Sequence, residues 1–213
     1  MKKNANTVID RTAHDTQFLL CDPAGNVTER ISTDEEWVAS PISCLDRAIE
    51  RRPTIIMVRF GQVTIRERDA LVELIGVLKQ NSHTRDIPVL ALLDSKHRGL
   101  LEDLDQVGVN SIKYVGEIAL ESTQLQGIIE GLGPDDRLAR HLTMLCPFLH
   151  YREIDSQHEM TVCGAYLDRM ILGGRRLREL CETESHLHCE YFLNPRHKCS
   201  LPADRKLNEY EKK

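Results

Sequence analysis

The sequence predicts an α/β protein with a mainly parallel sheet, followed by a small helical, cysteine-rich domain. Two observations lead to this prediction. Short apolar strands alternate with amphipathic helices from residue 16 to residue 130, an order typical of a parallel sheet with helices on both faces. Beyond residue 136, five of the seven cysteines and six of the nine histidines gather in one segment. The five cysteines are Cys146, Cys163, Cys181, Cys189 and Cys199.

The composition is that of a globular protein, with 213 residues of which 41% are apolar and 29% charged. A net charge of −5 gives no electrostatic reason to expect binding to nucleic acid or to an anionic membrane. No apolar run approaches the ~20 residues that span a bilayer, and the N-terminus lacks the apolar core of a signal peptide. We therefore expect a cytoplasmic protein, in which clustered cysteines are metal ligands or redox thiols rather than disulfides.

The N-terminal segment predicts a loose arm and then a β-hairpin. Residues 1–15 are polar and without periodicity. Phe18–Cys21 is a short apolar strand, the turn-forming run Asp22–Asn26 follows it, and Val27–Ile31 alternates apolar with polar residues. Two short strands joined by such a loop are typical of a hairpin.

Helix and strand signals then alternate. Ser40 and Pro41 are suited to the N-cap and first position of a helix that ends at Arg52. Thr54–Val58 is a continuous apolar strand, as in a sheet covered on both faces. Thr64, with Glu67 three residues later, predicts a capping box at the start of the next helix.

The same alternation continues to residue 130. Strands are predicted at Ile87–Leu93 and Val109–Val115, and helices at Leu100–Gln106 and Ile118–Ile129. Gly108 is placed to end the first of these helices. The run Gly-Leu-Gly-Pro-Asp-Asp at 131–136 breaks the pattern and predicts a linker. The predicted domains are thus 16–130 and 137–199, with a charged tail at 200–213.

Three segments carry a resemblance to a known family: Arg52–Val58, Thr84–Leu90 and Gly108–Ile112. From Thr33 to Val115, the order of elements resembles the receiver domain of bacterial response regulators. The resemblance implies a flavodoxin-like fold, a role in signal transduction, and a face that binds a protein partner or forms a homodimer.

The sequence departs from receivers at the phosphorylation site. The position of the phosphorylated aspartate holds Arg59, whose guanidinium accepts no phosphoryl group and repels Mg²⁺. Leu93 stands where a hydroxyl residue is expected, and the expected lysine falls nearest Val115, with Lys113 two positions early. Asp22 remains as a single acid of the metal site. We therefore expect a pseudo-receiver that is not phosphorylated.

The C-terminal cysteines resemble the four-cysteine tails of some bacterial regulatory proteins. This implies a cofactor held by Cys146, Cys163, Cys181 and Cys189, with a [4Fe–4S] cluster favoured over zinc. No C-x2-C pair is present, so the spacing itself leaves open a metal-free packed tail or a thiol–disulfide pair. Cys199 lies in a polar tail and is left out of the set. His186 and His188 are the substitutes if one cysteine is not a ligand.

Geometry adds a requirement between the last two ligands. If Cys181 and Cys189 shared one helix, their thiols would lie ~12 Å apart along its axis. Thr183 and Ser185 favour turns and N-caps, so we expect the chain to reverse between them. The other two cysteines, Cys21 and Cys44, fall on an apolar strand and a helix, and are expected to be buried small hydrophobes.

These expectations combine into a non-catalytic regulatory protein. No phosphate-binding glycine loop or dinucleotide motif is present, which argues against the common nucleotide-dependent enzymes. In the cluster hypothesis, the cysteine tail senses redox state, oxygen or iron; in the zinc hypothesis, the metal only supplies folding energy. The alternative is a metal-free adaptor that docks a partner.

Overall fold

The chain forms two compact units. The computed structural model describes residues 18–24, 35–116 and 121–196. The first unit takes its described residues from Met1–Lys96 and Asp103–Ala139, and the second takes its own from His97–Glu102 and Arg140–Lys213.

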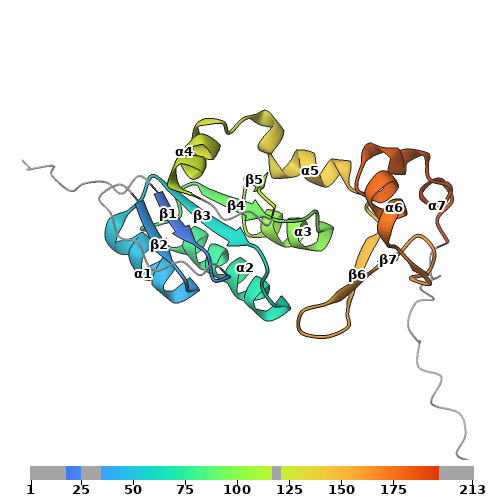
Figure 1. Cartoon of the computed structure of the whole chain (residues 1–213), viewed down its shortest axis with the longest axis horizontal. Coiled ribbons are helices and arrows are strands. Elements are labelled where there is room, and N and C mark those ends of the chain that lie inside the picture. The colour runs from blue at the N-terminus through green and yellow to red at the C-terminus, as the bar shows by residue number, and fades with distance from the viewer. Residues whose placement is uncertain (1–17, 25–34, 117–120, 197–213) are drawn as a thin grey trace, which may run out of the picture. The chain divides into compact units, whose positions relative to one another are not determined.

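The first unit contains a five-stranded sheet in which every neighbouring pair is parallel (Figure 1). The strand order β2-β1-β3-β4-β5 is the order of flavodoxin-like doubly wound folds. The predicted mainly parallel sheet is therefore confirmed. The strands are β1 (Phe18–Cys21), β2 (Glu35–Val38), β3 (Ile55–Phe60), β4 (Val89–Leu93) and β5 (Ser111–Tyr114).

The predicted N-terminal hairpin is wrong. Leu20 of β1 lies opposite Trp37 of β2 on one side and opposite Met57 of β3 on the other, in parallel in both cases. With both edges paired, β1 has no edge left for a hairpin partner. All four residues of β1 are buried, as expected of an internal strand. The expected second strand, Val27–Ile31, lies outside the described residues.

The helices that alternate with these strands along the chain are α1 (Pro41–Arg51), α2 (Ile65–Gln80), α3 (Arg98–Gln106) and α4 (Ser122–Glu130). Ser40 caps α1 as predicted, since its hydroxyl accepts a hydrogen bond from the Ser43 N–H at 3.2 Å. Gly108, with φ of 86°, supplies the left-handed conformation after α3. Helix α4 begins later than predicted, and residues 117–120 lie outside the description.

The capping box at α2 gives a first stability prediction. Thr64 Oγ1 accepts from the Glu67 N–H, and Glu67 Oε2 accepts from the Thr64 N–H at 2.7 Å. The latter bond, with one from the Thr64 hydroxyl, lowers the pKa of Glu67. We expect Thr64→Ala to lower the free energy of unfolding by about 1 kcal/mol in urea titrations, and Thr64→Ser to preserve it. Equal midpoints for all three proteins would contradict the cap.

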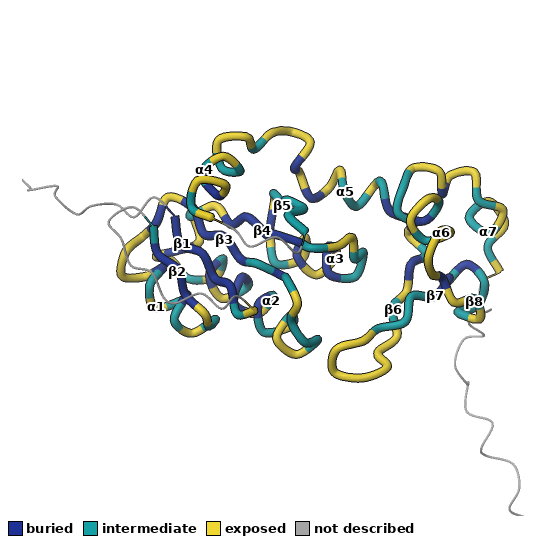
Figure 2. The backbone as a smooth tube through the Cα atoms, viewed as in Figure 1, coloured by how far each residue is buried: buried dark blue, intermediate teal, exposed yellow. Residues whose placement is uncertain are grey.

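The core of the first unit lies on both faces of the sheet. On one face, Leu125 of α4 packs with alternate strand residues, including Phe18, Leu20, Met57 and Leu90. Helices α1 and α2 cover the other face (Figure 1). Figure 2 shows the central strands as the most continuously buried segments of this unit.

The second unit contains a sheet that the predicted helical domain did not include. Strands β6 (Leu149–Glu153), β7 (Glu159–Cys163) and β8 (Met170–Ile171) form an antiparallel sheet in that order. Asp155 produces the β6–β7 turn, because its Oδ1 accepts from the backbone N–H groups of Gln157 and His158. The prediction of a small helical domain is therefore corrected: residues 149–171 lack a helical apolar stripe, and they form strands joined by a turn.

Short helical segments complete the chain. They are η1 (Pro134–Asp136), α5 (Leu138–Met144), α6 (Gly174–Arg176), the π-helical turn η2 (Leu177–Cys181), η3 (Glu184–His188) and α7 (Glu190–Leu193). None of the helices in the described parts of the chain is long and apolar enough to cross a membrane.

Candidate functional site

The four predicted ligands line one small cavity of the second unit. Cys146 lies between α5 and β6, Cys163 ends β7, Cys181 ends η2, and Cys189 is the N-cap of α7. These are four separate segments of the chain. The structure therefore brings together the four cysteines that sequence reasoning selected.

The backbone explains how these segments meet. The Cys146 N–H donates to the Cys181 carbonyl at 2.8 Å, which joins the first and third segments. In the β6–β7 ladder, Leu149 lies opposite Cys163, so the second thiol follows from the strand register. The expected break after Cys181 is present, and both Cys181 and Cys189 line the cavity. Helix η2 ends there, and Thr183 begins a new 3₁₀ helix by accepting from the Ser185 N–H.

The cavity has mostly apolar walls. Phe148 meets Phe192 edge-on, with ring centroids 6.0 Å apart. Leu149, Met170 and Leu172 add aliphatic surface. The open volume at the centre is about 10 Å³, roughly the room that one water molecule needs. A larger group would require the side chains around it to turn outward.

The thiols influence one another electrostatically. Burial raises the pKa of Cys146 and Cys163, and it raises the pKa of Cys181 to about 12, with the other three thiols adding to the effect. The Arg176 guanidinium acts in the opposite direction on Cys163 and Cys181. Negative charge on all four sulfurs is therefore unfavourable by itself, and a central cation would relieve the repulsion.

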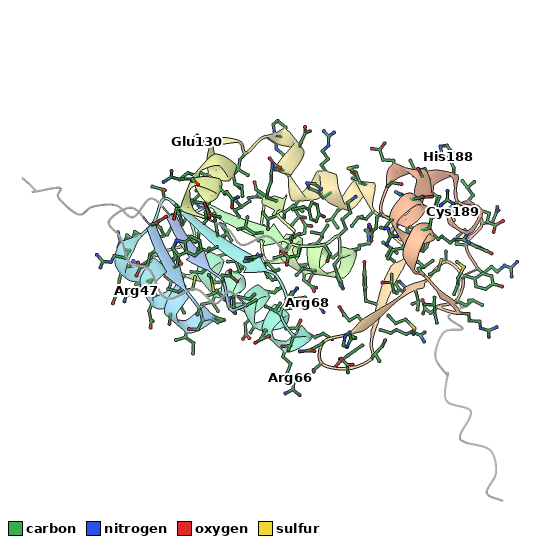
Figure 3. The ribbon with its side chains drawn as sticks, in the orientation of Figure 1. Arg47, Arg66, Arg68, Glu130, His188 and Cys189 are labelled. Atoms are coloured by element: carbon green, nitrogen blue, oxygen red, sulfur yellow. The ribbon has the colours of Figure 1, made fainter. Side chains whose placement is uncertain are left out.

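The two histidine substitutes differ in position. His186 is buried and lines the cavity; its Nδ1 donates to the Thr183 carbonyl at 2.7 Å, so in the neutral ring Nε2 is the nitrogen that carries the lone pair. His188 is exposed and does not line the cavity, although it precedes Cys189 in sequence (Figure 3). Cys199 lies outside the described residues. Within the described ranges, no group of three or more His, Cys, Asp or Glu residues is arranged to hold a metal ion.

The cysteines of the first unit form a separate pair. Cys21 in β1 and Cys44 in α1 are fully buried, as predicted. A hydrogen bond with Cys21, together with burial, raises the pKa of Cys44. Its thiol therefore stays protonated and unreactive, which fits a packing role.

Arg59 lies among acids at the carboxyl ends of the strands, where doubly wound folds place their ligand sites. Its Nη1 is 3.2 Å from Asp22 Oδ2, and its Nε is 3.9 Å from Asp94 Oδ1. Its Nη2 also donates to the Gly116 carbonyl at 3.5 Å. Lys113 bonds to Asp136 at 2.8 Å instead of joining this group. The guanidinium thus places a positive charge beside both Asp22 and Asp94.

Asp94 was missed in the sequence. Its position in the sequence could have identified it. Asp94 directly follows the apolar strand β4, just as Asp22 directly follows β1, and the carboxyl ends of parallel strands meet at one edge of the sheet. Its place next to Arg59 becomes evident only when the strand order is known.

The Arg59 arrangement predicts that the protein is inert to a phosphodonor. Incubation with acetyl phosphate and Mg²⁺ should leave the intact mass unchanged, because Asp22 and Asp94 both face a fixed guanidinium. A receiver domain with its aspartate in place, treated in parallel, serves as the positive control. A stable phosphoaspartate on this chain would contradict the prediction.

Comparisons with known proteins give one kind of match. No protein-family model matches the chain, and no curated protein matches it. Among solved structures, it is similar to a response regulator from Desulfuromonas acetoxidans, with 20% sequence identity and a TM-score of 0.34. The match covers 46% of this chain and 73% of that one. Similarity this low carries no argument about function, so the fold assignment rests on the strand order described above.

Proposed function

We propose that this chain is a non-catalytic regulatory protein with a thiol-bound [4Fe–4S] cluster in its second unit. One observation carries the proposal: Cys146, Cys163, Cys181 and Cys189 come from four separate segments and line a single cavity. An all-thiol donor set within apolar walls suits an iron–sulfur cluster, and it also suits zinc. Zinc is therefore the alternative occupant.

The proposed roles of the residues follow from their positions. The four cysteines would hold the group, while Phe148 and Phe192 restrict its contact with water. A bound cluster would supply a centre that responds to redox state, oxygen or iron, whereas zinc would supply folding energy. Because Arg59 occupies the phosphorylation region of the first unit, the signal would enter through the thiols.

The first unit is proposed to act through protein contacts. It offers a second cavity of about 380 Å³ between β5 and α4, lined by Tyr114, Val115, Gln124, Gly127 and Ile128. The protein bound by this unit would be either a different protein or a second copy of this chain, in a homodimer.

A metal-free adaptor is the competing function, and two observations favour it. The centre of the thiol cavity is small, and no described group of side chains is arranged to hold a metal ion. In this reading, the cysteines only pack the second unit.

Metal analysis of the full chain, purified without oxygen, separates these functions. Brown protein that contains iron and sulfide supports the cluster. Colourless protein with stoichiometric zinc supports the structural metal instead. Protein that contains neither, and that takes up neither on reconstitution, would overturn the proposal and favour the adaptor.

A further inference from the structure

The start of helix α3 belongs to the second unit, and His97 is the first of the residues that hold it there. Its ring stacks on Tyr151 of β6, with centroids 3.6 Å apart. Its Nδ1 accepts from the Leu100 N–H at 2.9 Å, so Nε2 carries the proton and donates to Glu159 Oε2 at 3.0 Å. A Cβ added at Gly99 would lie 3.2 Å from the His97 ring, so the close stack favours glycine there.

Arg98 makes a second set of bonds within the same unit. Its backbone N–H donates to the Tyr151 hydroxyl at 2.9 Å. One guanidinium nitrogen, Nη1, donates both to the Leu142 carbonyl at 3.1 Å and to the Leu145 carbonyl at 2.9 Å. Its Nε bonds to Glu102 at 2.7 Å, and the side chain is only 15% exposed. We refer to His97 and Arg98 together as the α3 clamp.

The groups that receive these bonds lie on the segments that carry the thiols. Leu145 directly precedes Cys146, whose own N–H bonds to the Cys181 carbonyl. Glu159 begins β7, and Cys163 ends it. The charge of Arg98 also acts on Cys146 and lowers its pKa against the larger effect of burial. A change in the position of Cys146 would therefore alter the bond between Arg98 and the Leu145 carbonyl, and a change in the position of β7 would alter the bond between His97 and Glu159.

Helix α3 is continuous from Arg98 to Gln106, although its first five residues cluster with the second unit and the rest with the first. Ordering its first turn removes the entropic cost of nucleating the helix, so the effect extends along it. A coupling of this kind is reciprocal: a bound group that favours the clamped state is itself bound more tightly when the clamp is intact.

We propose that the α3 clamp couples occupation of the four-thiol site to the order of helix α3. The inference rests on the proposed function, because it requires that the thiols bind a group. As a consequence, binding of a group in the second unit would change the order of helix α3. The C-terminal end of this helix, from Asp103, belongs to the receiver-like unit.

Hydrogen exchange on the full chain tests the coupling, before and after anaerobic reconstitution with iron and sulfide. In the wild type, reconstitution should slow exchange of the α3 amides from Leu100 to Gln106, by about fivefold to 150-fold. Arg98→Ala should remove most of this difference and weaken iron retention against a chelator by a similar factor. Arg98→Lys should restore part of both effects, because a single nitrogen makes both carbonyl bonds in the wild type.

Two matched variants control for general damage. Glu102→Gln keeps both carbonyl bonds of Arg98 and should retain the coupling. Arg85→Ala removes an exposed arginine of the first unit and should behave as wild type. If the wild type binds iron and sulfide but α3 exchanges equally in both states, the clamp proposal is overturned. If no group binds under any condition, the proposed function fails, and the clamp inference falls with it.

Discussion

If the four-thiol site binds the group that we propose, replacing Cys146, Cys163, Cys181 or Cys189 by serine, one at a time, should remove most of that metal from the protein. Each thiol comes from its own segment, so no neighbouring cysteine can take its place. Loss of an outer-shell partner typically costs about 10–100-fold in metal affinity, and loss of a direct ligand should cost more. Iron, sulfide and zinc contents of the anaerobically purified variants measure the effect.

The control is Cys199→Ser, which removes a cysteine from outside the proposed set and should leave the metal content unchanged. The Cys189 variant is the most informative of the four. Cys189 is only partly buried, so its replacement should disturb the packing of the second unit least. Variants of all four cysteines that keep a full metal content would refute the ligand assignment. Retention in the Cys189 variant alone would point to His186, which lines the same cavity.

Arg59→Leu should cause a large loss of stability in the first unit. The Arg59 side chain is 11% exposed, and it lies between Asp22 at 3% and Asp94 at 14%. Arg59→Leu breaks the buried Arg59–Asp22 ion pair and removes the positive charge next to Asp94, and breaking a buried ion pair typically costs about 3–5 kcal/mol. The measurement is the free energy of unfolding from urea titrations of the full chain.

A double variant distinguishes charge from packing. Asp22→Asn combined with Arg59→Leu removes one of the two carboxylate charges, so it should recover part of the lost stability. If the double variant is no more stable than Arg59→Leu, the loss arises from the guanidinium stem and not from uncompensated charge. If Arg59→Leu itself is as stable as the wild type, the ion-pair interpretation is wrong.

Much of the first unit could be predicted because its signals are local. The capping box at Thr64, the cap at Ser40 and the buried apolar run of β3 all lie within a few neighbouring residues. The N-terminal hairpin failed for a physical reason. Turn-forming residues after β1 indicate only that the strand ends, whereas pairing depends on which edges β2 and β3 occupy.

The candidate site could be predicted in its residue types but not in its surroundings. Thiol donors and the turn at Thr183 are visible in the sequence. Arg98 bonds to the Leu145 carbonyl, just before Cys146, from 47 residues earlier in the chain, so no spacing pattern reveals it. The β6–β7 sheet was overlooked for a different reason: its strands are short and partly exposed, and their apolar alternation is weak.

The distribution of the four thiols has a consequence for folding. A group bonded to all of them would act as a cross-link that closes successive loops between Cys146 and Cys189, and so lowers the conformational entropy of the unfolded chain. Apart from its cysteines, the buried apolar side chains in the described part of the second unit are few: Leu100, Leu101, Leu145, Leu149, Val162, Ala165 and Leu172. Because the last thiol is Cys189, the cross-link can be completed only after the ribosome has released nearly the whole unit. Cofactor supply would then influence whether a newly made chain folds or is degraded.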